Sequence, residues 1–499
     1  MDVAWQGLQA ALSPTSLVVI LSGVFIGIIM GIIPGIGAGV GLALLLPVIF
    51  NFPPTLGLML LIALWAADGY GASITSILLK VPGGAGAVAT AFDGYPMARQ
   101  GKGGEAIGLS MGASMVGAII GTIVLMLVAP PLAVLAVEIG PAEYTVLGVL
   151  GMALIGGLSS KQRLKGLIAA MIGLMSSFIG YDLTTGFVRY NFGTQYLFDG
   201  VELSIAIIGI FAIASLVEAG QEGGTIAEVG RMTGSVFKGV KDSLVGHPLA
   251  TLRGSLAGVV MGMVPGIGIT LSSLAAYDLE KRLSKHPERF GTGVAEGVIA
   301  PEAANNSTQP ASLIPTLTLG IPAGSTSAIF LGALIMYGIT PGLTLFQQRG
   351  VMVWTLMWGI IVASIAFVAV GLLFANFFAR LTLVPLKYLV PVTLVTCFIG
   401  AYAENHAYGD LVMAVVFGGI GVMMAALNYP PAPAILGVVL GPIMERNYYR
   451  SLLMSEGSYA PFFETPLVLG LWTLLVLVLV GPWVFNRLSQ KAPSPAPQG

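Results

Sequence analysis

The chain has 499 residues, of which 56% are hydrophobic and 9% charged, with a mean hydropathy of +0.91 and a net charge of −1. Soluble domains carry roughly 25% charged residues, so the composition excludes a soluble protein and predicts an all-α polytopic membrane protein. The near-zero charge argues against nucleic acid as a partner. A single cysteine excludes an internal disulfide, and three scattered histidines give no zinc motif.

Apolar stretches of about 20 residues predict membrane helices along the whole chain. In the first half they lie at 16–50, 57–79, 107–136, 142–158, 164–180 and 201–218. In the second half they lie at 252–280, 293–330, 352–377, 384–402, 410–427, 432–444 and 465–486. Because broken stretches can count as one or two passes, they predict about 12 to 14 membrane segments. The Trp and Tyr residues are interpreted as an interfacial aromatic belt.

One helix-breaking motif occurs twice. Segment 31–37 reads GIIPGIG and segment 262–268, 231 positions later, reads GMVPGIG, with five of seven residues identical. A broken helix in hydrocarbon is tolerated only where its free backbone groups face protein or a water-filled cavity. Two such breaks about half a chain apart predict a secondary transporter built from two repeats. Each break forms either the tip of a helical hairpin or a kink in one helix.

Basic residues predict the orientation of the loops. They place 93–105, 159–165 and 220–252 in the cytoplasm, whereas 181–200, with Arg189 alone, is predicted to be periplasmic. Corresponding loops of the two halves carry opposite charge character, which predicts inverted-topology repeats. The predicted organisation is repeat 1 at 10–219, a cytoplasmic connecting segment at 220–252, repeat 2 at 253–487 and a disordered tail at 488–499.

Each half also has a second interruption, rich in hydroxyl, amide and glycine residues. Residues 68–76 lead into KVPGGAG at 80–86, and 305–308 lead into GIPAGSTS at 320–327, so that Pro82 and Pro322 align at an offset of 240. Helix N-termini bind carboxylates, and freed carbonyls with hydroxyl and amide oxygens can replace the hydration shell of Na⁺. The doubled cluster predicts a transport site; the alternative is that small residues only allow tight packing.

The candidate residues divide into two sets, with no catalytic residue, no cofactor and Na⁺ as a candidate coupling ion. The predicted carboxylate-binding residues are Ser73, Thr75, Ser76, Lys80, Pro82, Gly83, Gly84, Pro322, Gly324, Ser325 and Thr326. The predicted coupling-ion residues are Pro34, Gly35, Gly37, Asp68, Pro265, Gly266, Gly268, Asn305, Asn306, Ser307 and Thr308. Lys80 could instead snorkel to the cytoplasmic edge, and Glu296 and Glu302 could simply mark the start of a helix.

Taken together, several motifs resemble the large membrane subunit of bacterial tripartite tricarboxylate transporters, the TctA family. They are PGIG at 34–37 with its repeat, ADGYGAS at 67–73, KVPGG at 80–84, FDGYPM at 92–97 and PEAANN at 301–306, and the resemblance spans residues 10–490. It implies a permease, not an enzyme, of the bacterial inner membrane. The permease would import citrate-like carboxylates on a Na⁺ or H⁺ gradient, with a small TctB-like membrane subunit and a periplasmic TctC-like solute-binding protein.

The main alternative is a stand-alone ion-coupled anion carrier that needs no binding protein. A channel has less need of duplicated breaks, and no metal or nucleophile constellation supports a membrane-embedded enzyme.

Overall fold

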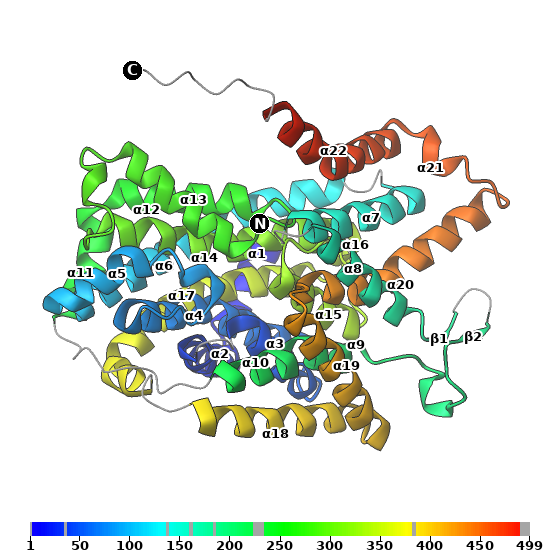
Figure 1. The fold of residues 1–499 in the computed structure, drawn as a ribbon, viewed down its shortest axis with the longest axis horizontal. Coiled ribbons are helices and arrows are strands. Elements are labelled where there is room, and N and C mark those ends of the chain that lie inside the picture. Colours follow the sequence, from blue (N-terminus) through cyan, green and yellow to red (C-terminus); the bar gives the residue numbers. More distant parts are fainter. Residues whose placement is uncertain are drawn as a thin grey trace.

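The computed structural model describes residues 2–33, 37–135, 139–158, 163–182, 186–222, 234–381 and 386–489. Within these residues the chain is helical almost throughout (Figure 1), and its strands are one short antiparallel pair, β1 (Gly180–Tyr181) and β2 (Val188–Arg189). The predicted all-α fold is confirmed.

Most helices of the first half follow the predicted apolar stretches, while those at 2–11 and 91–97 lie outside them. The helices are α1 (Asp2–Ala11), α2 (Pro14–Ile32), α3 (Gly37–Ile49), α4 (Pro54–Leu79), α5 (Ala91–Met97), α6 (Gly103–Leu135), α7 (Pro141–Leu158), α8 (Arg163–Ser177), α9 (Leu203–Ile207) and α10 (Ala214–Glu222). A short 3₁₀ turn, η1 (Ala85–Ala87), precedes α5, and a π-helical stretch, η5 (Ile208–Ile213), joins α9 to α10.

The second half has the same helical character. Its helices are α11 (Val236–Lys241), α12 (Pro248–Gly262), α13 (Gly268–Leu283), α14 (Glu296–Leu319), α15 (Ser325–Met336), α16 (Leu343–Gln348), α17 (Gly350–Leu381), α18 (Leu386–Asn405), α19 (Tyr408–Ala426), α20 (Pro431–Met454), α21 (Pro461–Glu464) and α22 (Pro466–Ser489). The predicted connecting segment at 220–252 contains the end of α10 at Glu222, the short helix α11 and the start of α12 at Pro248. Its residues 223–233 lie outside the described residues. Of the predicted tail, 490–499 also lie outside them.

Six helical segments among the described residues are long and apolar enough to cross a membrane. They are Pro14–Ile32, Pro54–Leu79, Ala91–Leu135, Leu203–Gln221, Gly350–Leu381 and Tyr408–Ala426. Shorter apolar helices, among them α3 and α15, add to these. The chain is therefore a multi-pass membrane protein, and the larger total of membrane segments stays a prediction.

The two halves repeat one packing unit. Glycines on α2 and α12 lie so close to α4 and α14 that an added Cβ would collide with the neighbouring backbone. The pairs are Gly23 with Leu60, Gly27 with Leu64 and Gly31 with Asp68 in the first half, and Gly254 with Ala300, Gly258 with Ala304 and Gly262 with Thr308 in the second. The glycines are 231 positions apart and their partners 240, the two offsets of the sequence motifs. Small residues let helices approach closely within lipid, so the duplication is visible in the packing itself.

Both α4 and α14 stop in the same way. Lys80 (φ 61°) and Gly320 (φ 68°), 240 positions apart, cap the two helices in the left-handed conformation. That conformation ends a helix and turns the chain away from its axis. The segments that follow, 81–84 and 321–324, are therefore non-helical and lead into η1 and α15.

The second PGIG segment joins two helices of similar length that lie side by side. Figure 1 shows α12 and α13 as neighbouring rods, and both also pack against α14. Since only 263–267 separate them, they run antiparallel and form a helical hairpin rather than one kinked helix. In the first copy α2 and α3 are also neighbours, but 34–36 lie outside the described residues.

Candidate functional site

A cavity of about 760 Å³ lies between the two halves. Its wall contains parts of both PGIG segments and of both second interruptions. Ligand pockets commonly measure roughly 300–1,000 Å³, so a small polycarboxylate fits this volume together with water. Segments far apart in the sequence thus come together around one space.

Eleven of the predicted residues line this cavity. They are Gly83, Gly84, Gly324, Ser325 and Thr326 from the carboxylate set, and Gly37, Asp68, Gly266, Gly268, Asn305 and Thr308 from the coupling-ion set. The rest of the coupling-ion set is Pro265, Asn306 and Ser307, which do not line it, and Pro34 and Gly35, which lie outside the described residues.

Four other polar residues of the predicted sets donate side-chain hydrogen bonds to backbone carbonyls and do not line the cavity. Ser76 Oγ donates to the Ala87 carbonyl at 2.8 Å, Asn306 Nδ2 to the Ala66 carbonyl at 3.1 Å and Ser307 Oγ to the Ser255 carbonyl at 2.9 Å. Thr75 bonds back to its own helix at the Ala72 carbonyl. Ser73, Pro82 and Pro322 are also absent from the lining. In this structure none of these residues lines the cavity.

Lys80 does not enter the cavity. Its side chain is exposed and its Nζ lies 5.8 Å from the centroid of the Tyr95 ring. The left-handed cap at Lys80 turns the chain away from the axis of α4, and the last residue of α4 that lines the cavity, Ala72, lies eight residues earlier. The geometry matches the snorkelling alternative rather than the role of anion ligand.

The two walls differ in what they offer an anion. In the second half, Gly324 is the N-cap of the twelve-residue helix α15, and Ser325, Thr326 and Ser327 form its first turn beside the cavity. The orphan N–H groups of a helix start attract carboxylates. In the first half, Gly83 and Gly84 precede only the three-residue turn η1. The backbone of η1 packs against α14, where Gly86 lies directly against the side chain of Asn305.

Asp68 is the acidic residue in the wall. Asp68 is 7% exposed, and its Oδ1 is buried without a hydrogen-bond partner among the described residues. No Lys or Arg of the described chain lines the cavity with it. A buried carboxylate oxygen without a partner is unfavourable unless a cation, a proton or water joins it.

Several lining residues were missed by the sequence analysis, above all Trp65. Trp65 is 3% exposed, so its assignment to an interfacial belt is wrong, and its Nε1–H has no partner among the described residues. Gln309 and Ser312 also line the cavity. They lie one and two turns beyond Asn305 and so share its helical face; that spacing is the signal that could have found them.

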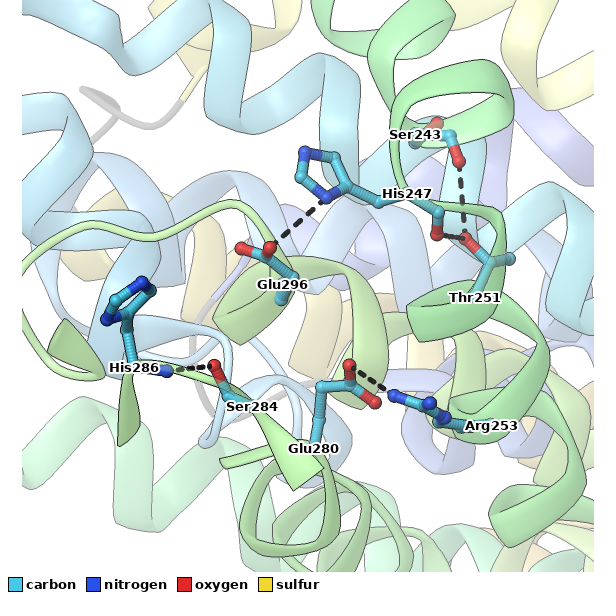
Figure 2. A network of polar contacts seen from close by, with 8 residues as sticks. All are labelled: Ser243, His247, Thr251, Arg253, Glu280, Ser284, His286 and Glu296. Carbon is cyan, nitrogen blue, oxygen red and sulfur yellow. Dashed lines mark hydrogen bonds and ion pairs between the residues drawn. The ribbon is translucent and has the colours of Figure 1, made fainter. Parts of the chain in front are cut away.

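A second polar group lies apart from the cavity, at the predicted cytoplasmic edge. Figure 2 shows His247 Nδ1 facing Glu296 Oε1 at 3.3 Å and Arg253 Nη1 facing Glu280 Oε1 at 3.3 Å. The hydrogen bond to Glu296 raises the pKa of His247. Glu296 is the first residue of α14, as predicted, but Glu302 is not at a helix start: it is fully buried inside α14.

Comparison with known proteins identifies the lineage. The model of the tripartite tricarboxylate transporter TctA family matches residues 17–436. An uncharacterized 52.8 kDa protein in the TAR-I ttuC′ 3′ region of Agrobacterium vitis is 34% identical over 465 residues, covering 93% of this chain and 92% of that protein. An uncharacterized protein in the TAR-II ttuC′ 3′ region of the same organism is 34% identical over 236 residues, 47% of this chain and 98% of that protein.

No solved structure matches the chain. The family match includes both PGIG segments and both interruptions that line the cavity. The chain belongs to the tripartite tricarboxylate transporter TctA family.

Proposed function

We propose that this chain is the permease subunit of a binding-protein-dependent secondary transporter in the bacterial inner membrane. It imports citrate-like carboxylates on a Na⁺ or H⁺ gradient, together with a small TctB-like membrane subunit and a periplasmic TctC-like solute-binding protein. The observation that carries the proposal is the cavity, because both copies of both motifs contribute to one wall that includes Asp68, whose Oδ1 has no hydrogen-bond partner among the described residues.

The anion is held by the second half. The first-turn N–H groups of α15, with the hydroxyls of Ser325 and Thr326, receive one carboxylate of the substrate. The free indole N–H of Trp65 supplies a donor from the first half. A substrate with two or three carboxylates can engage both walls at once, which a monocarboxylate cannot.

The coupling ion is held by Asp68 with the amide and hydroxyl oxygens of Asn305 and Thr308 across the cavity. An anion at roughly 6 Å from an unneutralised Asp68 would be repelled by about 3 kcal/mol at an effective dielectric constant of about 20. A bound cation or proton removes this repulsion. Substrate and ion therefore favour one another's binding, which is the thermodynamic requirement of symport.

The test is uptake of labelled citrate, tartrate and succinate into proteoliposomes that contain the chain with its small-subunit partner. An imposed Na⁺ or H⁺ gradient is varied, with the binding protein present or omitted. Uptake that needs both gradient and binding protein supports the proposal. Uptake with the gradient alone identifies the stand-alone carrier instead, and flux without saturation identifies a channel.

A further inference from the structure

Glu302 is fully buried and has no ion-pair partner among the described residues. Four hydroxyl groups surround its carboxylate. Ser73 Oγ donates to Oε1 at 2.5 Å and Thr90 Oγ1 also donates to Oε1, while Ser110 Oγ and Ser114 Oγ donate to Oε2 at 3.0 and 2.9 Å. All four hydroxyl residues are themselves buried. One carboxylate from the second half is thus bound by three segments of the first.

The two oxygens of Glu302 face different parts of the molecule. Oε2 faces α6, which packs against α14 so closely that Gly117 lies on the Ala303 carbonyl. Oε1 faces Ser73 on α4 and Thr90 after η1, and these two segments form the cavity wall at Gly69 and Gly84. Separation of this wall from α14 would break the hydrogen bonds at Oε1.

The site accommodates two protonation states. Ser73 Oγ lies 2.5 Å from Glu302 Oε1 and 3.0 Å from the Gly69 carbonyl, so its single proton has two acceptors. When Glu302 is ionised, the hydroxyl donates to Oε1. When Oε1 is protonated, it donates to Ser73 Oγ and the Ser73 hydroxyl turns to Gly69. The ionised carboxylate depends on these donors, because without them it would be a buried, unpaired charge, whereas the neutral acid can lose the contacts at Oε1 at much lower cost.

We propose that Glu302 is a proton-binding residue whose protonation releases the cavity wall formed by α4 and the segment before α5. A proton bound on the periplasmic side neutralises Glu302, the wall separates from α14, and the proton leaves to the cytoplasm before the wall closes. Glu302 is six residues from the start of α14, about 9 Å along its axis. That places it between the cavity and the predicted cytoplasmic edge. The inference rests on the proposed function and names a coupling residue additional to Asp68.

Other titratable groups on the packed elements have their own positions. They are Asp68 and Tyr70 on α4, Asp93 and Tyr95 on α5, Glu105 on α6, Arg253 on α12, Tyr277, Asp278, Glu280, Lys281 and Arg282 on α13, and Glu296 on α14. Glu105 pairs with Lys238, Arg253 with Glu280 and Asp278 with Arg282, while Asp93 accepts hydrogen bonds from Tyr277 and the 291–294 backbone. None of these residues is joined to Glu302 by an ion pair or hydrogen bond in the described chain.

Substitution of Glu302 by Gln keeps the shape of the side chain and removes its ability to bind and release a proton. In proteoliposomes with both partner subunits, Glu302→Gln should still exchange internal for external labelled citrate but should lose accumulation driven by a pH gradient. Glu296→Gln, which changes the other carboxylate of α14, should retain both. Accumulation by Glu302→Gln equal to that of the unchanged protein would overturn the assignment. So would accumulation that follows Na⁺ and ignores the pH gradient.

A second readout needs no substrate and remains informative if the variant does not transport. Ala89, next to Thr90, is fully buried, and the free Cys397 can be replaced by Ala. In that background the labelling rate of Ala89→Cys by a methanethiosulfonate reagent is measured with Glu302 and with Glu302→Gln. At each pH the labelling rate with Glu302 is divided by the rate with Glu302→Gln. This ratio cancels the effect of the titration of the thiol itself.

The ratio should approach one at low pH and fall by about tenfold per pH unit once Glu302 ionises, because one proton controls the opening. A ratio that does not change with pH means that the hydroxyl cluster is purely structural, and the inference fails. Absence of citrate uptake under every gradient counts against the proposed function alone, because the labelling result stands independently of transport.

Discussion

At the scale of single residues, two buried carboxylates have opposite surroundings. Asp68 lines the cavity and has a buried Oδ1 without a partner among the described residues, whereas Glu302 lies behind the wall with four hydroxyl donors. Burial is unfavourable for an ionised carboxylate in both places. Hydroxyl donors compensate it at Glu302, and only a bound ion or the water of the cavity can compensate it at Asp68. We therefore expect the exchangeable ion to bind at Asp68 rather than at Glu302.

Replacing Asp68 by Asn should uncouple the ion from the substrate. The asparagine removes the charge that repels an incoming anion, so citrate binding should no longer depend on the cation. The dependence that disappears corresponds to about 3 kcal/mol, or roughly a hundredfold in affinity. Calorimetric titration of the purified permease with citrate, with and without Na⁺ and at two pH values, measures it. An unchanged cation dependence would contradict the role given to Asp68.

The pair of His247 and Glu296 should make stability depend on pH. The pKa of His247 is raised by Glu296, so the folded protein binds the proton more tightly than the unfolded chain. The stabilisation is complete below the unfolded pKa of about 6.5 and is lost as the pH rises through the higher folded value. Because both side chains are about one-third exposed, we expect at most about 1 kcal/mol.

Thermal unfolding in detergent tests this expectation. His247→Gln should lower the melting temperature at pH 6 and have little effect at pH 9. The matched control is His286→Gln, since the pair of His286 with Glu288 is about two-thirds exposed. Equal effects of His247→Gln at both pH values would show that the side chain acts through packing alone.

At the scale of elements, the duplicated glycine stripes set how closely the helices approach. Gly27 on α2 and Gly258 on α12 occupy equivalent places, and each faces a backbone carbonyl, of Leu64 on α4 and of Ala304 on α14. Gly258 also faces the Ser307 hydroxyl, but at both positions the backbone carbonyl cannot move aside as a flexible side chain could. The close approach also places Asp68 and Thr308, one turn further along, at the cavity.

Gly27→Leu and Gly258→Leu should both prevent stable folding. Overpacking in a dense interior destabilises by roughly 1–3 kcal/mol, and more where backbone must shift. We expect loss of the monodisperse peak in detergent size-exclusion chromatography for both variants. Gly419→Leu on α19 is the control, because its position is exposed and an added Cβ meets nothing within 4 Å. A normal profile for either variant would mean that the two helices can separate without loss of the fold.

At the scale of the whole molecule, the cavity exists only when both halves are in place. Its wall takes Asp68 and Gly84 from one half and Thr308 and Gly324 from the other. A ligand that binds the folded state stabilises it by about 2.7 kcal/mol at a hundredfold excess over its dissociation constant. The stabilisation must therefore appear in the unfolding of the complete chain.

Citrate should raise the melting temperature of the unchanged protein but not that of Gly324→Val. Gly324 has an extended backbone (φ −163°) that valine adopts without strain, and its Cβ would meet nothing within 4 Å. The variant should fold normally while its side chain fills the start of α15. Gly419→Val serves as the control and should keep the full citrate effect. Equal stabilisation of Gly324→Val would place the ligand elsewhere.

The sequence by itself determined the class of fold, the duplication and the family. A membrane forces the backbone into helices wherever apolar residues run long enough, and Pro and Gly mark the breaks in any context. These signals are local, so 16–50 and 252–280 could be identified as interrupted helices, and the motifs around them as a transport site. Eleven of the predicted residues do line one cavity.

Only the tertiary structure decided which side of each helix faces that cavity. Ser73 and Asp68 lie five residues apart on α4, yet one binds Glu302 behind the wall and the other faces the cavity. Residues on all faces of this helix are buried. The sequence therefore shows no single hydrophobic stripe from which the orientation of the helix about its axis could be predicted. The direction of Lys80, the burial of Trp65 and the four hydroxyls on Glu302 follow from how α4, α6 and α14 pack. That packing depends on contacts between residues as many as 240 positions apart.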